Sequence, residues 1–445
     1  MLFKSIAKDV TDQMYIDANL KAAQDRKNEV VKRLSLYHDQ MEDYVNIDLA
    51  KHHNDPDVLT PTYFNLVKKL CNNLAMAYLS NPTREVVGTK RDQQIYQHII
   101  ESSKLDVKMK VVSRYAKLLK TLLIRPIWRD GKIELDVLTG DILDILTANT
   151  VEKLERVMIT NYPQSGKQND INYSVWDKDI FRRLDHNGNE IEVEENPYKL
   201  LPFIPIWDSW PCAGTFWMPG GDDLINCQEA VNARLTELQL TLRYQAFGVA
   251  VSKGMSDGTV REVGPNSVIE IQDPEGSFEY KKTHSPIAAM LEAIEFLSKN
   301  LAITNGLPAQ SMSIKATQES GLAKISGNRE LEESRRDQLS LFSTFEKELF
   351  TMNKIIWNYH NPNRKLSEES RLKIDFADPK PVLDPLKQVE SFEKELNMGT
   401  KSRTDILMIQ NPDLTKEDAQ VKLQEIIEEN KQFNPPTQAL KEERE

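Results

Sequence analysis

The most regular pattern of apolar and polar positions lies between residues 222 and 247. Its apolar side chains recur every three or four residues, as they do on one face of an α-helix. They are Leu224, Cys227, Val231, Leu235, Leu238 and Leu242. Asp222 and Asp223 stand at the start, where a carboxylate caps a helix and favours the positive end of its dipole. We predict a helix of 26 residues with one buried face, about 39 Å long.

A second helix is predicted from Pro286 to Thr304, and a short β-rich segment separates it from the first. Four β-like runs lie in that segment between turns that contain Gly or Pro. They are Gly248–Ser252, Val260–Val263, Ser267–Ile271 and Phe278–Lys281. Roughly 35 residues bury little surface alone, so we expect this module to be stabilised by packing on a neighbouring copy of the chain.

Helical spacing also occurs nearer the N-terminus. We predict one or two surface helices between Tyr15 and Leu49, a helix that begins at Pro61 and ends before Asn81, and a helix from Arg91 to Leu119. A polar stretch from Pro308 precedes a further long helix, from Leu322 to His360. These segments make the chain rich in helix.

Between these helices, short β-like runs predict an antiparallel sheet. A hairpin is expected from Leu122 to Val137, because two such runs meet at Asp130-Gly131. Further strands are predicted at Arg156–Tyr162, Ile171–Trp176 and Ile180–Leu184. The proline-rich stretch from Pro197 to Pro219 is interpreted as a packed connector, since its prolines exclude one long helix.

The C-terminal region returns to helical spacing. One strand is predicted around Ile374–Phe376, before a linker that contains prolines. Helices follow from Asp384 to Glu429, with breaks at Met398-Gly399 and Asn411-Pro412. Residues 433–445 have the composition of a solvated tail.

Composition narrows the class of protein. The chain has 445 residues, of which 40% are hydrophobic and 28% charged, a balance typical of a folded globular protein with several subdomains. Its longest apolar runs are far shorter than the roughly 20 residues that span a bilayer, so no membrane partner is expected. The start of the chain lacks the apolar segment of a signal peptide, and we expect synthesis in the cytoplasm.

The charge and the cysteines exclude further classes. A formal net charge of −11 opposes the broad basic face with which ordinary DNA-binding proteins hold DNA. DNA that meets this protein should therefore not be gripped tightly. Three cysteines without a CxxC pair predict neither a disulfide framework nor a zinc site.

Motifs that would carry catalysis are few. The chain has no GxxxxGK[ST] phosphate loop and no HExxH motif, which argues against a motor ATPase and a zinc hydrolase. Its GxSxG string, Gly254 to Gly258, leads into another β-like run instead of the helix that a hydrolase nucleophile requires. Asp141, Asp144 and the pair Asp222-Asp223 could serve a magnesium-dependent nuclease, but turn and cap positions explain them as well. We expect no enzyme activity, no cofactor and no resident metal.

Several short sequence strings follow one another in a fixed order along the chain. They are Asn196-Pro197-Tyr198, Pro202-Phe203-Ile204-Pro205, the positions Asn226, Asn232 and Leu235, Gly264-Pro265-Asn266-Ser267, Thr304-Asn305-Gly306-Leu307-Pro308 and Ser320-Gly321-Leu322-Ala323-Lys324. Each string is weak alone, and their order is much more specific. With the helix, β module, helix arrangement, this order resembles the portal protein of tailed bacteriophages over about residues 60 to 430.

The resemblance implies an α+β, helix-rich portal fold with a wing, a two-helix stem, a small α/β clip and a short helical crown. The implied domains are an N-terminal helical segment (1–60), the wing (61–221), stem helix 1 (222–247), the clip (248–282), stem helix 2 (283–305), the tunnel loop with the long helix and a wing strand (306–382), the crown helices (383–432) and a flexible tail (433–445). The first 60 residues match no portal motif.

The resemblance also implies a function at one vertex of the virion capsid. Portal proteins form a homo-oligomeric ring, usually of twelve subunits, through which the genome is packaged and ejected. The implied partners are the terminase, the scaffolding protein, the major capsid protein, a head-completion adaptor and double-stranded DNA that passes without sequence-specific contacts.

Two sets of residues are candidates for those contacts. The clip residues expected to meet the terminase or the adaptor are Val260, Arg261, Glu262, Pro265 and Asn266. The residues expected to meet DNA in the channel are Ser311, Ser313, Lys315 and Thr317. The second set is polar and lies in the loop Gln310–Gln318, which shows little helical periodicity.

Two other classes of protein stay open on the residues alone. A metal-dependent nuclease or another soluble enzyme would need a clustered acidic or nucleophilic site. A helical scaffolding protein would form an elongated oligomer without a channel, but no a/d heptad pattern persists along the chain. Both are alternatives to the portal interpretation.

Overall fold

The computed structural model describes residues 2–52, 60–211, 214–247, 249–253, 277–281, 287–313, 329–376, 385–411 and 414–433. The chain forms two compact units, residues 1–377 and 378–445. The first unit contains both larger sheets and the long helices, and the second is helical in its described part.

Three helices open the first unit: α1 (Leu2–Ala18), α2 (Lys21–Tyr37) and α3 (Glu42–His52). The prediction of one or two helices between residues 15 and 49 is confirmed by α2 and α3, but these helices are more deeply buried than surface helices. Leu36, Met41 and Leu49 are almost completely buried, because α2 packs on α4 and α6 while α3 packs on α7. Spacing alone predicts which side chains share a helix face but not how deeply that face is covered.

The next elements are α4 (Leu66–Leu74), β1 (Thr83–Val87), α5 (Lys90–Ser103) and α6 (Leu105–Leu119). The predicted helix start at Pro61 was wrong, since α4 begins five residues later and is capped by the side chain of Asn65. The single helix predicted from Arg91 to Leu119 was also wrong. Lys104, with φ of 54°, adopts the left-handed conformation between α5 and α6 and ends the first helix there.

Two antiparallel sheets follow, with strand orders β3-β2-β9 and β4-β5-β6-β7-β8. The strands are β2 (Thr121–Arg129), β3 (Lys132–Leu138), β4 (Leu143–Thr147), β5 (Leu154–Asn161), β6 (Asn172–Trp176), β7 (Ile180–Leu184), β8 (Glu190–Glu195) and β9 (Ile204–Trp207), with the short helix η2 (Gln168–Asp170) before β6. The hairpin prediction is confirmed: Asp130 and Gly131 both have positive φ in the turn between β2 and β3. The connector prediction missed β9, which pairs with the start of β2.

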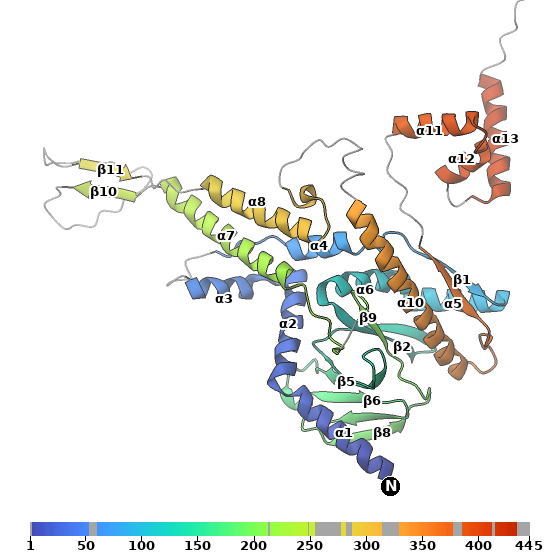
Figure 1. The fold of residues 1–445 in the computed structure, drawn as a ribbon, viewed down its shortest axis with the longest axis horizontal. Helices are drawn as coiled ribbons and strands as arrows, with labels where there is room; N and C mark the ends of the chain where they lie inside the picture. The colour runs from blue at the N-terminus through green and yellow to red at the C-terminus, as the bar shows by residue number, and fades with distance from the viewer. Residues whose placement is uncertain are drawn as a thin grey trace, which may run out of the picture. The chain divides into compact units, whose positions relative to one another are not determined.

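The main core lies between the sheets, α5, α6 and α10 (Arg329–His360). Tyr96, Phe345 and Phe350 are its largest completely buried side chains. On the opposite face of the five-stranded sheet, Met14 of α1 packs against Met158 and Val175, and Figure 1 shows α1 beside this sheet. The sheet is therefore covered on both faces.

The remaining elements of the first unit are α7 (Asp222–Phe247), β10 (Val249–Lys253), β11 (Ser277–Lys281), α8 (Ile287–Thr304), η3 (Ala309–Met312), α10 and β12 (Arg371–Asp375). The predictions of both helices and of the outer two strands of the small module are confirmed. Its inner two predicted strands lie outside the described residues. β12 pairs with β1, which joins the C-terminal end of the unit to the strand before α5.

The second unit contains α11 (Pro385–Asn397), α12 (Arg403–Gln410) and α13 (Lys416–Phe433). The breaks predicted near Gly399 and Asn411 are confirmed. Gly399 has φ of 69°, and Ser402 caps α12 in a reciprocal arrangement with Asp405. Within the described ranges of the chain, no helix is both long and apolar enough to cross a membrane.

Candidate functional site: the antiparallel helix pair and its attachments

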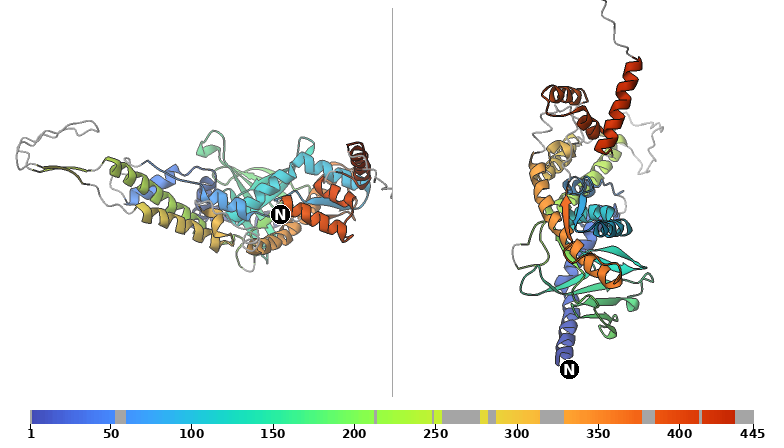
Figure 2. Two further views of the ribbon diagram at one scale, coloured as in Figure 1. Left: turned by 90° about the horizontal axis from the view of Figure 1, so that it is seen from above. Right: turned by 90° about the vertical axis from the view of Figure 1, so that its right-hand side faces the viewer.

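The helices α7 and α8 run side by side in opposite directions (Figures 1 and 2). Val231, Leu235 and Leu238 of α7 bury themselves against Ile294 of α8. Of the six apolar positions predicted to face the interior, these three and Leu224 are buried, whereas Leu242 is exposed. The pair is therefore held together by the predicted face of α7.

Two polar contacts set the register of the pair. The Cys227 thiol donates to the Leu297 carbonyl at 3.6 Å, and the Asn305 side-chain amide donates to Asp223 Oδ2 at 3.2 Å. Asp223 stands in the first turn of α7, and Asn305 directly follows α8. The start of α7 is thus level with the end of α8.

Arg33 of α2 anchors the start of α7. Its guanidinium donates to the Gly220 carbonyl at 2.8 Å and to the Leu118 carbonyl at 3.2 Å, and it pairs with Asp222 at 2.5 Å. Gly221 has φ of 85°, and a Cβ there would lie 3.0 Å from an Arg33 nitrogen. This turn therefore requires glycine for its backbone conformation and for the close approach of Arg33.

A buried ladder of polar side chains attaches α7 to the segment before α4. Gln228 accepts from the Leu66 and Val67 backbone N–H groups at 2.8 and 3.1 Å and donates to the Phe64 carbonyl at 2.7 Å. Two turns further, the Thr236 hydroxyl accepts from the Thr62 N–H at 3.0 Å. Because Gln228 satisfies open N–H groups at the start of α4, it fixes both where α4 begins and how α7 lies against it.

The long helix α10 is anchored by a buried ion pair. Arg84 of β1 donates to Glu346 at 2.7 and 3.0 Å, and Tyr78 donates to the same carboxylate at 2.7 Å. Burial alone would lower the pKa of Arg84, but hydrogen bonds and charge from Glu346, with help from Asp106, outweigh it and raise that pKa. Burial, followed by the Glu346 charge, raises the pKa of Tyr78. Arg84 therefore stays charged, and the Tyr78 hydroxyl keeps the proton that it donates.

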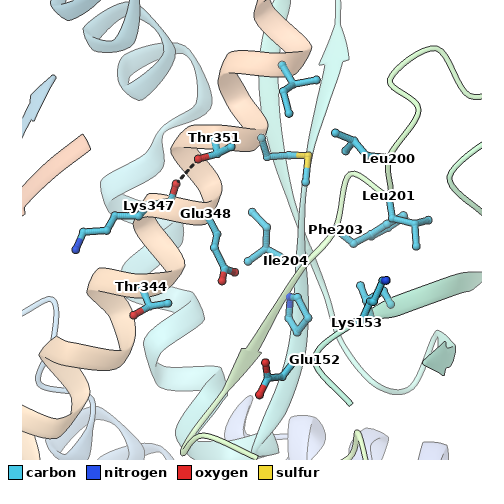
Figure 3. Close-up of a pocket in the computed structure, with 14 residues that line it drawn as sticks. Glu152, Lys153, Leu200, Leu201, Phe203, Ile204, Thr344, Lys347, Glu348 and Thr351 are labelled. Atoms are coloured by element: carbon cyan, nitrogen blue, oxygen red, sulfur yellow. Dashed lines mark hydrogen bonds between the residues drawn. The ribbon is translucent and has the colours of Figure 1, made fainter. Parts of the chain in front are cut away.

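A pocket of about 640 Å³ lies between α10, the start of β5 and the connector that leads into β9 (Figure 3). Its apolar wall includes Leu201, Phe203 and Ile204. Glu348 lines the pocket from α10, and burial, followed by the nearby charge of Glu152, raises its pKa. The lining suits apolar side chains. Sequence reasoning missed this pocket, because the α10 residues that line it have the spacing of an ordinary solvated face.

Only part of the predicted contact residues falls within the described chain. Ser311 lies in η3, and Ser313 follows it with its hydroxyl donating to Glu295 of α8 at 3.3 Å. Lys315 and Thr317 lie outside the described residues. The clip candidates Val260, Arg261, Glu262, Pro265 and Asn266 also lie outside them. The structure therefore places two of the nine candidates beside α8.

The carboxylates that a nuclease would use are engaged in structural contacts. Asp144 pairs with Arg26 at 2.9 Å and with Lys27 at 2.6 Å, and Asp222 pairs with Arg33. Asp141 accepts from the Thr139 hydroxyl. Within the residues that the structure describes, no group of three or more His, Cys, Asp and Glu side chains is placed to hold a metal ion.

Comparison with known proteins gives three findings. The model of the family described as phage portal protein, SPP1 Gp6-like, matches residues 20–433. The comparison with curated protein sequences found no match. Among solved structures, the neck of an empty gene transfer agent particle computed with C6 symmetry is similar at 11% identity and a TM-score of 0.44, with 77% of this chain and 88% of that chain covered. The neck of the native particle computed with C12 symmetry gives 11% identity, a TM-score of 0.42, and coverage of 78% and 90%.

The family match over residues 20–433 defines the class of this protein of mixed helical and β architecture: it is a portal protein. The chain belongs to the phage portal protein family of the SPP1 Gp6-like kind, because the family model matches most of its length. The family is structural rather than enzymatic, and its members act at the capsid vertex.

Proposed function

We propose that this chain forms a homo-oligomeric ring of about twelve subunits at one vertex of a phage capsid, with a central channel through which double-stranded DNA is packaged and ejected. The observation that carries the proposal is the family match over residues 20–433. The antiparallel pair α7 and α8, with the β10–β11 hairpin between them in the chain, agrees with the stem and clip of that family.

Each part of the chain has a role in the proposal. Residues 222–247 and 283–305 form the stem, and residues 248–282 form the clip, where Val260, Arg261, Glu262, Pro265 and Asn266 meet the terminase and later a head-completion adaptor. Residues 61–221 and 306–382 build the wing and the tunnel loop, and residues 383–432 form the crown. The scaffolding protein and the major capsid protein are the partners during assembly.

The acidic charge of the chain supports passage of DNA without adhesion. At −11 per subunit, twelve copies carry about −132, and a net acidic ring repels phosphate instead of gripping it. Ser311, Ser313, Lys315 and Thr317 supply polar contacts at the channel wall. DNA then slides past without a strong, salt-sensitive attachment.

Negative-stain electron microscopy and mass photometry on the purified protein test this proposal. Rings with a central hole, and a mass near twelve times 51.1 kDa, are expected from the protein alone or after addition of the scaffolding protein. A compact closed dimer without a channel, in the presence of the scaffolding protein, would contradict the portal ring and favour the enzyme alternative.

A further inference from the structure

The helix α8 carries apolar side chains on two opposite faces. Ile294 and Leu301 are buried on the side that meets α7. Phe296 and Ile303 lie on the opposite side, seven residues apart, with 64% and 56% of their surface exposed. A helix that is apolar on both sides is normally covered on both sides. Within the residues that the structure describes, nothing covers the second side of α8.

The helix α7 also has one side without a partner. Val231, Leu235 and Leu238 meet α8, while Gln228 and Thr236 bind the segment before α4. Helical geometry leaves a third side. This side contains Asn226, Ala230, Ala233, Arg234 and Glu237, which are partly or fully exposed, and Glu237 already has an interaction of its own. Its two alanines have little bulk, so a large apolar side chain can approach the helix closely there.

Opposite charges stand on these two sides. Arg234 donates to the Ala230 carbonyl of its own helix at 2.9 Å, and Glu292 is exposed on α8 on the same side as Phe296. Within the described part of the chain, neither of these two charges belongs to an ion pair. Two uncompensated charges of opposite sign, on separate exposed sides of one helix pair, are complementary between copies of the chain.

The register of the pair places these residues at matching heights. Counting from the Cys227–Leu297 contact brings Arg234 level with Met290, and counting from the Asp223–Asn305 contact brings it level with Ile294. Glu292 lies midway between. By the same count, Ala230 is level with Phe296, the midpoint of residues 294 and 298. The large Phe296 therefore lies at the height of the small Ala230. The acidic Glu292 lies at the height of the basic Arg234.

We propose that the exposed side of α8 in one copy packs against the third side of α7 in the next copy, with Phe296 over Ala230 and Glu292 paired with Arg234. The inference rests on the proposed ring. In a ring, each copy presents two different surfaces to its two neighbours, and residues at one height meet when the helix pair runs along the rotation axis. The match in side-chain size between Phe296 and Ala230 connects the same two surfaces as the match in charge between Glu292 and Arg234.

Charge reversal tested across subunits checks this interface. Arg234→Glu and Glu292→Arg each place like charges at every interface, and each is expected to weaken ring formation about tenfold or more. An equimolar mixture of the two variants is expected to restore rings, because alternating copies pair opposite charges at each interface. A contact within one chain cannot be restored by mixing, since every chain keeps its own mismatch.

Two controls carry the same change of net charge at exposed positions elsewhere. Lys110→Glu and Asp25→Arg should assemble like the unaltered protein, and all variants should keep its circular dichroism spectrum. If the unaltered protein forms rings and the reversed variants form them equally well, the interface is refuted while the ring stands. If the single reversals fail and the mixture also fails, the interface between copies is refuted too. Absence of rings from the unaltered protein with the scaffolding protein would instead refute the proposed function.

A covalent test is independent of charge. The double variant Ala230→Cys with Phe296→Cys is expected to give a ladder of disulfide-linked multimers on oxidation, while each single variant stays largely monomeric on a non-reducing gel. A double variant with Val107→Cys, an exposed apolar position on α6, in place of Phe296→Cys is the matched control. Equal ladders from both double variants would overturn the proposed contact.

Discussion

At the scale of single residues, the charges of Arg84 and Glu346 are stable in the folded protein only because of the side chains around them. Their side chains are 3% and 0% exposed, so neither charge is solvated by water. A buried ion pair compensates for lost hydration only while its hydrogen bonds are complete. Tyr78 on one side and Asp106 on the other complete them here, which makes the four side chains one unit.

Replacing Glu346 by Ala should lower the free energy of unfolding by about 3 to 5 kcal/mol, because it leaves the buried Arg84 charge and the Tyr78 hydroxyl without their acceptor. Chemical denaturation followed by circular dichroism measures this loss. Glu85→Ala is the control, since its pair with Lys373 is exposed and should contribute less than about 1 kcal/mol. Equal losses in the two variants would show that Arg84 is hydrated in the folded state.

This cluster of four interacting side chains could not be predicted from the sequence. Arg84 and Glu346 lie 262 residues apart, and each stands directly before another charged residue, Glu85 or Lys347, as is typical of an exposed surface. The same holds for Arg33, which reaches a carbonyl 187 residues away. Long-range partners of charged residues leave no local pattern, so only the fold reveals them.

At the scale of elements, α7 shows which properties of a helix can be predicted from its sequence and which cannot. Its bounds and its apolar face follow from periodicity, because apolar side chains must share one side of a helix to be buried together. Gln228 and Asn232 are also buried, although polar residues at those positions suggest an exposed side. Gln228 finds its partners in the backbone of residues 64–67. Asn232 accepts from the Gln228 amide and donates to the Met41 sulfur, and nothing in the local sequence indicates either set of partners.

Gln228→Leu should lower the free energy of unfolding by about 2 to 4 kcal/mol. Leucine fills similar space, but it leaves the buried Val67 N–H without its acceptor. The Leu66 N–H and the Phe64 carbonyl lose their bonds to Gln228 and keep only the 3.2 Å bond to each other. Gln239→Leu, at an exposed position of the same helix, is the matched control and should change stability by less than about 0.5 kcal/mol. If the two variants unfold alike in thermal and chemical denaturation, water must satisfy these backbone groups, and the ladder does not hold α7 in place.

The candidate interface on α8 was only half predictable. The apolar spacing from Met290 to Leu301 correctly predicts a helix with a buried side. Phe296 and Ile303 give that helix apolar residues on the other side as well, and periodicity cannot distinguish a side covered by the same chain from one left for another copy. The structure separates them, because α7 covers one side and leaves the other exposed.

At the scale of the whole molecule, the hydrophobic clusters and the proposed interface between copies lie in the same unit. The four clusters of buried residues found in the described chain consist of residues before 378, and so do α7 and α8. The second unit has its own small interior, in which Ala419 is completely buried. The boundary at Asp378 therefore separates two units that each have buried residues of their own.

Ending the chain at Ala377 should leave the first unit folded and able to form rings. Its unfolding midpoint should stay within about 2 °C of that of the full chain, because no cluster of buried residues in the first unit loses a member. Differential scanning calorimetry and electron microscopy measure the two properties, and a chain that lacks only residues 434–445 is the control. A midpoint lowered by more than about 5 °C would show that the second unit completes the core of the first. Loss of rings at an unchanged midpoint would instead place an essential contact between copies in the second unit, so that the α7–α8 interface alone would not suffice for assembly.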